Sequence, residues 1–165
     1  MDIKNLIQTL RHKQQLPPAQ MQLLLTAAFS DDAARTELAR QAQQTAQAVF
    51  GNKIYIRGLI EFTNYCRNDC YYCGIRRSNA AASRYRLSKK QILSCCEMGY
   101  ALGFRTFVLQ GGEDGSFTDD RLTDIISSIR TRWRACAITL SVGERSYESY
   151  KRLYDAGANR FLLRH

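Results

Sequence analysis

The 165-residue sequence is long enough for a domain with a hydrophobic core, and its 45% hydrophobic and 24% charged residues are typical of a globular protein. The formal net charge is +9, but the basic residues are spread along the chain, which indicates a solvated surface and disfavours a nucleic-acid-binding protein. No apolar run reaches membrane-spanning length, and the start, MDIKNLIQTLRHKQQ, lacks the apolar core of a signal peptide. We therefore expect a cytoplasmic protein whose thiols stay reduced.

Residues 1–52 are predicted to form an N-terminal helical extension. Runs of apolar and helix-favouring residues fill this part of the chain. Ser30 and Asp31 are candidate N-caps for its last helix, because their side-chain oxygens can accept from unpaired amides of a first turn. Gly51 is expected to end that helix.

From Lys53 onward, predicted strands and helices alternate. The first strand spans residues 53–62, with Ile54, Ile56, Ile60 and Phe62 expected on one side. Strands alternating with helices predict βαβ units and a parallel sheet, so the fold class is α/β. The further strands are expected at 105–110, 136–142 and 160–165, and the helices at 88–103, 119–133 and 144–156.

A faint internal repeat supports a barrel. The segments YALGFRTFVLQ (100–110) and YDAGANRFLLR (154–164) align without gaps and superpose Gly103 on Gly157. Each reads as a helix end, a glycine C-cap and an apolar strand, as expected of a (β/α) barrel built by reiteration. Residues 53–165 are thus predicted to form the first four βα units, the N-terminal half of such a barrel.

Unusual polar residues follow each predicted strand. Asn64 and a group of cysteines follow the first, QGGED (110–114) ends the second, SVGE (141–144) ends the third, and the fourth delivers Arg164. The carboxyl ends of parallel strands build the active sites of α/β folds, because the loops converge there. The coincidence of these motifs at one edge favours an enzyme over a binding module.

Three cysteines form a CxxxCxxC motif: Cys66, Cys70 and Cys73. Thiolates are soft ligands for zinc or iron–sulfur clusters. Structural zinc sites are usually built from two separated pairs of ligands, whereas this sequence has one group of three cysteines and no second pair. A [4Fe–4S] cluster held by three cysteines keeps one iron open to a small molecule. The pattern favours a cluster over zinc, and either over unligated thiols. The remaining cysteines are expected to be core residues: Cys95, Cys96 and Cys136.

The residues after the second and third strands have two readings each. Gly111 and Gly112 form a tight turn, or they let the backbone approach a ligand closely. Glu113 offers a carboxylate to an ammonium group. Ser141 is either a strand-end hydroxyl or a ligand contact, and Glu144 either complements a helix dipole or lines the site.

These motifs resemble the radical S-adenosylmethionine (radical SAM) superfamily. An aromatic residue, Tyr72, precedes the last cysteine of CxxxCxxC, and GGE follows the second strand. The blocks IEFTNYCRNDCYYCGIRRSN, GFRTFVLQGGED and SVGERSYESYKRLYDAGANRFLLRH are similar, over residues 53–165, to the HydE family of [FeFe]-hydrogenase maturases. Biotin synthase and methylornithine synthase are similar relatives.

The resemblance implies a [4Fe–4S] cluster on the three cysteines and S-adenosylmethionine bound to its open iron. Reductive cleavage of that cofactor then yields a 5′-deoxyadenosyl radical, in the service of H-cluster maturation. No catalytic residue beyond the cluster is implied. The implied metal ligands are Cys66, Cys70 and Cys73; the implied cofactor contacts are Tyr72, Gly111, Gly112, Glu113 and Glu144; the implied substrate contacts are Ser141 and Arg164.

The implied partners are a small-molecule substrate, an electron donor such as ferredoxin or flavodoxin, and other hydrogenase maturation proteins, without membrane or nucleic acid. Alternative activities are those of a methylornithine-synthase-like mutase or a biotin-synthase-like enzyme, and an alternative of another class is a non-catalytic metal-binding module. The family's barrel continues past His165 through a glutamate that contacts the cofactor. We therefore expect a truncated chain that is inactive alone.

Overall fold

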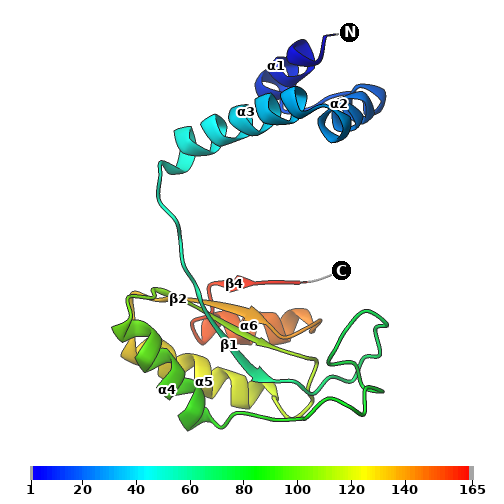
Figure 1. Ribbon diagram of the computed structural model, residues 1–165. Helices are drawn as coiled ribbons and strands as arrows, with labels where there is room; N and C mark the ends of the chain where they lie inside the picture. Colours follow the sequence, from blue (N-terminus) through cyan, green and yellow to red (C-terminus); the bar gives the residue numbers. More distant parts are fainter. Residues whose placement is uncertain (1, 164–165) are drawn as a thin grey trace. The chain divides into compact units, whose positions relative to one another are not determined.

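The computed structural model describes residues 2–163, which divide into two compact units with their boundary between Tyr55 and Ile56 (Figure 1). The first unit contains only helices, and the second contains a parallel sheet with its own helices. No helix in this described part combines the length and apolar content needed to cross a membrane.

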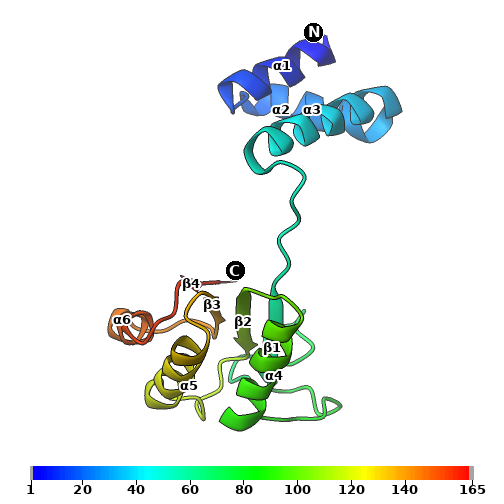
Figure 2. The same ribbon diagram turned by 90° about the vertical axis from the view of Figure 1, so that its left-hand side faces the viewer.

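The first unit consists of α1 (Ile3–Lys13), α2 (Pro18–Ser30) and α3 (Asp32–Phe50) (Figure 2). Its small core contains Leu6, Ile7 and Leu24. Asp31 caps α3 by accepting from the amide of Ala33, whereas Ser30 is the last residue of α2. Of the two candidate caps, Asp31 is therefore the one used, and the helix ends at Gly51 with a φ of +63°.

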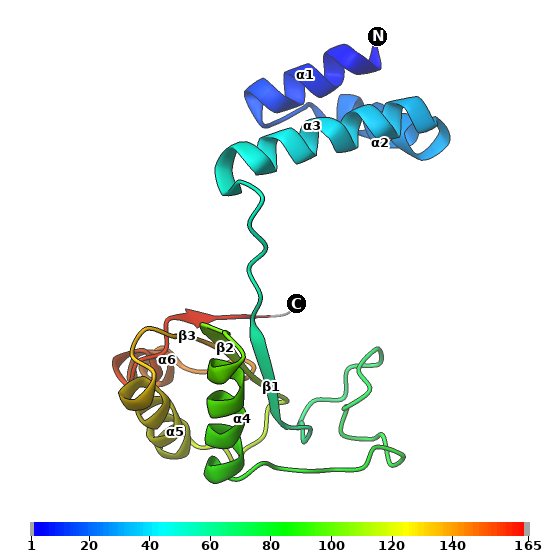
Figure 3. The same ribbon diagram turned by 60° about the vertical axis from the view of Figure 1, so that its left-hand side comes forward.

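The second unit is built on four parallel strands in the order β1-β2-β3-β4. Three helices connect successive strands and lie together on one side of the sheet (Figure 3). This arrangement is that of the first four βα units of a (β/α) barrel, as predicted. The strands are β1 (Gly58–Thr63), β2 (Thr106–Gly111), β3 (Ala137–Ser141) and β4 (Arg160–Phe161), and the helices are α4 (Lys89–Ala101), α5 (Asp119–Arg132) and α6 (Tyr147–Asp155).

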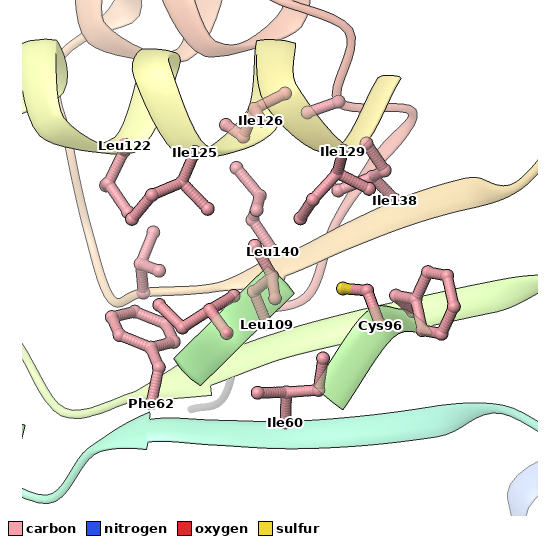
Figure 4. Close-up of a cluster of buried hydrophobic side chains, with 14 of the residues drawn as sticks. Ile60, Phe62, Cys96, Leu109, Leu122, Ile125, Ile126, Ile129, Ile138 and Leu140 are labelled. Atoms are coloured by element: carbon pink, nitrogen blue, oxygen red, sulfur yellow. The ribbon is translucent and has the colours of Figure 1, made fainter. Parts of the chain in front are cut away.

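The core lies between the helices and one face of the sheet (Figure 4). Successive side chains of a strand point to opposite faces, so Ile60 and Phe62 of β1 enter the core together. Helix α5 presents its apolar stripe to the same space. Buried residues of this core from the helices and the two central strands include Ile92, Cys96, Phe107, Leu109, Leu122, Ile125, Ile126, Ile129, Ile138 and Leu140.

The structure corrects two expectations about the strands. The strand predicted from Lys53 begins at Gly58, and Ile54 and Ile56 are 88% and 68% exposed. Their alternation produces no strand because Gly58 pairs with Phe107, near the start of β2, and earlier residues have no ladder partner. The fourth strand is shorter than predicted, with Arg160–Phe161 assigned to it.

The aligned repeat has the same hydrogen-bonded turn in both copies. After α4, Gly103 donates to the carbonyl of Tyr100; after α6, the aligned Gly157 donates to that of Tyr154. The amide of Phe104 donates to the carbonyl of Gly99, and the aligned amide of Ala158 donates to the carbonyl of Leu153. These bonds complete a Schellman motif at the end of each helix. The two glycines have φ angles of +94° and +119°, which L side chains rarely adopt.

Candidate active site

A cavity of about 420 Å³ lies at the carboxyl ends of the strands. Its walls come from the loop after β1, the end of β2, the end of β3 and the segment after β4. Arg164, the predicted substrate contact, falls outside the described residues. The structure brings the other predicted site residues around this cavity: Cys66, Cys70, Tyr72, Cys73, Gly111, Gly112, Glu113, Ser141 and Glu144.

The cysteine loop, residues 64–88, projects from the end of β1 and returns past it to the start of α4 (Figure 3). Thr63 and Arg86 form an antiparallel bridge, and the amide of Leu87 donates to the carbonyl of Phe62 at 2.7 Å. The side chain of Asn64 also joins the two ends of the loop, because its amide group donates to the carbonyl of Ser83 and its oxygen accepts from the backbone amide of Tyr85. The chain's own hydrogen bonds therefore close the loop at its base.

One arginine also organises the inside of the loop. The guanidinium of Arg84 donates to the carbonyl of Asn64, before the cysteines, at 2.5 Å. It also donates to the carbonyls of Ile75 and Arg76, after the cysteines, at 2.9 and 2.6 Å. A planar fork of donors suits this role, since it satisfies several loop carbonyls at once.

A buried aspartate ties the loop base to the segment after β2. Asp114 is 7% exposed and accepts two hydrogen bonds from Arg86, at 2.6 and 2.9 Å, and one from Thr63 at 2.7 Å. The guanidinium of Arg86 lies 3.7 Å from the ring centre of Tyr65. Burial alone raises the pKa of Asp114, but the bonds from Arg86 and Thr63 outweigh it and hold this pKa at about 2.

We expect Asp114→Asn to destabilise the protein by about 2 kcal/mol near neutral pH, because the variant loses the charge that Arg86 pairs with. The pKa of Asp114 in the folded protein lies below its ordinary value of 3.8, so the stabilisation is present above about pH 4 and is lost as the pH falls towards 2. Urea unfolding at a series of pH values measures this. Asp155→Asn, which breaks an exposed pair with Lys151, is the control and should cost little. Equal losses for both variants would contradict the assignment.

The segment after β2 packs directly on the first cysteine. A Cβ added to Gly112 would lie 2.2 Å from the carbonyl oxygen of Tyr65 and 2.7 Å from the Cβ of Cys66. No side chain fits in this space, so the second glycine of the GGE motif is required by the close approach of two loops.

The carboxylate of Glu113 faces both neighbouring loops. Its Oε2 accepts from Nε of Arg67 at 2.7 Å, and its Oε1 accepts from the amide of Glu144 at 3.4 Å. The sequence predicted Glu113 as a partner for an ammonium group, whereas in this structure a guanidinium of the same chain pairs with it.

A row of polar side chains crosses the inner face of the sheet. Register places Glu61 of β1 beside Gln110 of β2, and Gln110 beside Ser141 of β3; Nε2 of Gln110 donates to Oε1 of Glu61 at 3.0 Å. All three line the cavity. Sequence reasoning missed Glu61, although a charged residue between the apolar Ile60 and Phe62 was the available signal.

The donor set of the cavity fits an iron–sulfur cluster. Cys66, Cys70 and Cys73 are unpaired thiols at its wall, with Cys70 exposed. Within residues 2–163, no three His, Cys, Asp or Glu side chains converge on a point that could hold one metal ion. A [4Fe–4S] cluster takes each cysteine on a different iron, so its ligands surround it without converging on one atom.

Two of the other cysteines are unsuited to metal binding. Burial, with the neighbouring thiols Cys95 and Cys136, raises the pKa of Cys96 to about 12, and burial also raises the pKa of Cys136. Because the thiolate is the form that binds metal, these core thiols stay protonated and unreactive.

Comparison with known proteins adds an independent line of evidence. No family model matches the chain. It is 39% identical, over 128 residues, to the [FeFe] hydrogenase maturase subunit HydE of Thermotoga maritima, an alignment that covers 78% of this chain and 36% of HydE. This similarity supports the resemblance of the motifs to the HydE family over the aligned part of the chain. The chain is also 28% identical over 124 residues to the 3-methylornithine synthase of Methanosarcina acetivorans, covering 74% of this chain and 35% of that protein.

Comparison with solved structures agrees with the barrel fold. The crystal structure of methylornithine synthase (PylB) matches with a TM-score of 0.86 and 24% identity, over 96% of this chain and 46% of that one. At this identity the likeness establishes the fold. The chain spans about a third of the length of the curated relatives that it matches.

Proposed function

We propose that the whole protein is a radical SAM enzyme that holds a [4Fe–4S] cluster on Cys66, Cys70 and Cys73 and binds S-adenosylmethionine in the adjoining cavity. The observation that carries this proposal is that the three thiols open onto the same cavity as the Gly111–Gly112 backbone. When bound, the cluster supplies the electron that cleaves the sulfonium carbon–sulfur bond of S-adenosylmethionine into methionine and a 5′-deoxyadenosyl radical.

The chain's own residues bind and orient the cofactor. Gly111 and Gly112 line the cavity, and we assign their backbone carbonyls to the methionine ammonium group. We assign Tyr72 and Glu144, which also line the cavity, to the rest of the cofactor. Glu113 belongs to the cofactor site through the position of its loop.

We assign Ser141 and Arg164 to the substrate. The Ser141 hydroxyl lines the cavity at the end of β3, where it can accept or donate a hydrogen bond. The guanidinium of Arg164 suits a substrate carboxylate, because its donors match carboxylate geometry. The substrate itself is a small molecule that reaches the cavity beside the cofactor.

We propose hydrogenase H-cluster maturation as the pathway, because the HydE relative shares 39% identity, against 28% for 3-methylornithine synthase. A cytoplasmic location, other maturation proteins and an electron donor such as ferredoxin or flavodoxin belong to this proposal. A lysine mutase activity is the second candidate, supported by the PylB likeness. Incubation with lysine and detection of methylornithine would favour the second candidate over the first.

The decisive experiment is metal and sulfide analysis of the whole protein, purified and reconstituted without oxygen. We expect about four irons and four acid-labile sulfides per chain, and 5′-deoxyadenosine on reduction with S-adenosylmethionine. One zinc without sulfide would contradict the proposal and would favour a non-catalytic metal-binding module.

A further inference from the structure

Arg67, the residue directly after the first cysteine of the motif, holds Glu113 at two levels. Its backbone amide donates to the carbonyl of Glu113 at 3.0 Å. Its guanidinium also reaches the carboxylate of Glu113, where Nε and Nη2 each lie 2.7 Å from Oε2. The residue beside Cys66 is therefore fastened to the GGE segment by both main chain and side chain.

The same carboxylate contacts the loop after β3. Its Oε1 accepts from the amide of Glu144, and its Cγ fills the space beside Gly143, where an added Cβ would lie only 2.0 Å away. Gly143 has a φ of +76°, so glycine is favoured there by both conformation and space. Glu113 thus joins loops from three successive strands.

The side chains of Arg67 and Glu113 differ in solvent exposure, so the loss of one partner costs more than the loss of the other. The Arg67 side chain is 72% exposed, whereas that of Glu113 is 16% exposed. Solvating the arginine alone costs little, but a carboxylate this buried needs a partner. Loss of Arg67 therefore leaves the carboxylate of Glu113 poorly compensated, and we expect the loops that it joins to move apart.

We propose that Arg67 and Glu113 are a positioning pair, which transmits the placement of Cys66 to the GGE segment and the loop after β3. In this role the Glu113 carboxylate forms an ion pair with Arg67 and does not bind the methionine ammonium group. The inference rests on the proposed function, because it assigns these loops to S-adenosylmethionine. If the pair has this role, the affinity for S-adenosylmethionine depends on Arg67, an exposed residue of the cysteine loop.

A double-mutant cycle on the whole protein tests the pair: Arg67→Ala, Glu113→Ala and the two together. The control is Arg77→Ala, which removes an exposed arginine from the same loop. With the three cysteines intact, iron and sulfide contents should match the wild type. We expect each single variant to raise the dissociation constant for S-adenosylmethionine about three- to tenfold, read from the cofactor-induced change in the spectrum of the reduced cluster.

The double variant should bind no more weakly than Glu113→Ala alone, and Arg67→Lys, which keeps the charge, should recover part of the affinity. The proposal would be overturned if the affinity losses of the two single variants multiplied in the double variant. It would also be overturned if Arg67→Ala had the same affinity for S-adenosylmethionine as the Arg77→Ala control. A Glu113 carboxylate that binds the cofactor directly would give a far larger loss for Glu113→Ala than for Arg67→Ala.

Hydrogen exchange of the metal-free protein separates this proposal from the proposed function. The amide of Glu144 donates to Glu113, so Arg67→Ala should speed its exchange, whereas Arg77→Ala should not. If the wild type binds neither iron nor S-adenosylmethionine, the proposed function fails, and this exchange rate still decides whether the pair joins the loops.

Discussion

Serine at Cys66, Cys70 or Cys73 is expected to abolish the brown chromophore of the reconstituted protein and the reductive cleavage of S-adenosylmethionine. Each variant removes one of the thiolates at the cavity wall, and a hydroxyl is a poor replacement because it stays protonated and is a hard ligand. Iron and sulfide content, the visible spectrum and the yield of 5′-deoxyadenosine measure the loss.

Cys95→Ser is the matched control. Cys95 is half-buried, packs against the hydrophobic core and does not line the cavity. We expect this variant to keep its cluster and its activity, at most with a small loss of stability. A Cys95→Ser protein without a cluster, or a Cys70→Ser protein with a full one, would show that the ligand assignment is wrong.

Alanine at Gly112 is expected to have the second-largest effect. The new methyl group would overlap the Tyr65 carbonyl and the Cβ of Cys66, so one of the two loops has to shift. Overpacking against backbone typically costs 1–3 kcal/mol, and we expect a loss of about 3 kcal/mol in the free energy of unfolding. Because the shift displaces Cys66, iron retention should fall as well.

Gly115→Ala provides the comparison within the same segment. An added Cβ at Gly115 meets nothing within 4 Å, and its φ does not require glycine. The unfolding free energy of this variant should stay within about 0.5 kcal/mol of the wild type, with normal iron content. If Gly112→Ala were equally harmless, the close contact between the GGE segment and Cys66 would not exist in solution.

Three arginines of the cysteine loop have structural roles. Arg84 binds carbonyls on both sides of the cysteines, Arg86 neutralises the buried Asp114, and Arg67 pairs with Glu113. These arginines bind the protein's own oxygens. Their guanidinium groups therefore organise the loop that carries the thiols.

Local patterns in the sequence determined most of the fold. Ser88 and Gln91 form a reciprocal capping box at the start of α4, and the glycines 103 and 157 end α4 and α6 in the left-handed region. Such signals act within a few residues of the chain, so they need no tertiary information. The alternation of strands and helices then gave the parallel sheet and placed the cysteine loop at its carboxyl edge.

Tertiary structure alone decided the strand limits and the partners of the charged residues. The alternating residues Ile54 and Ile56 look like a strand, but a strand exists only where a neighbour completes its hydrogen bonds, and here that begins at Gly58. The pairs Arg67–Glu113 and Arg86–Asp114 join residues 46 and 28 positions apart. No local pattern encodes such pairs, because they arise only when parallel strands bring their following loops to one edge of the sheet.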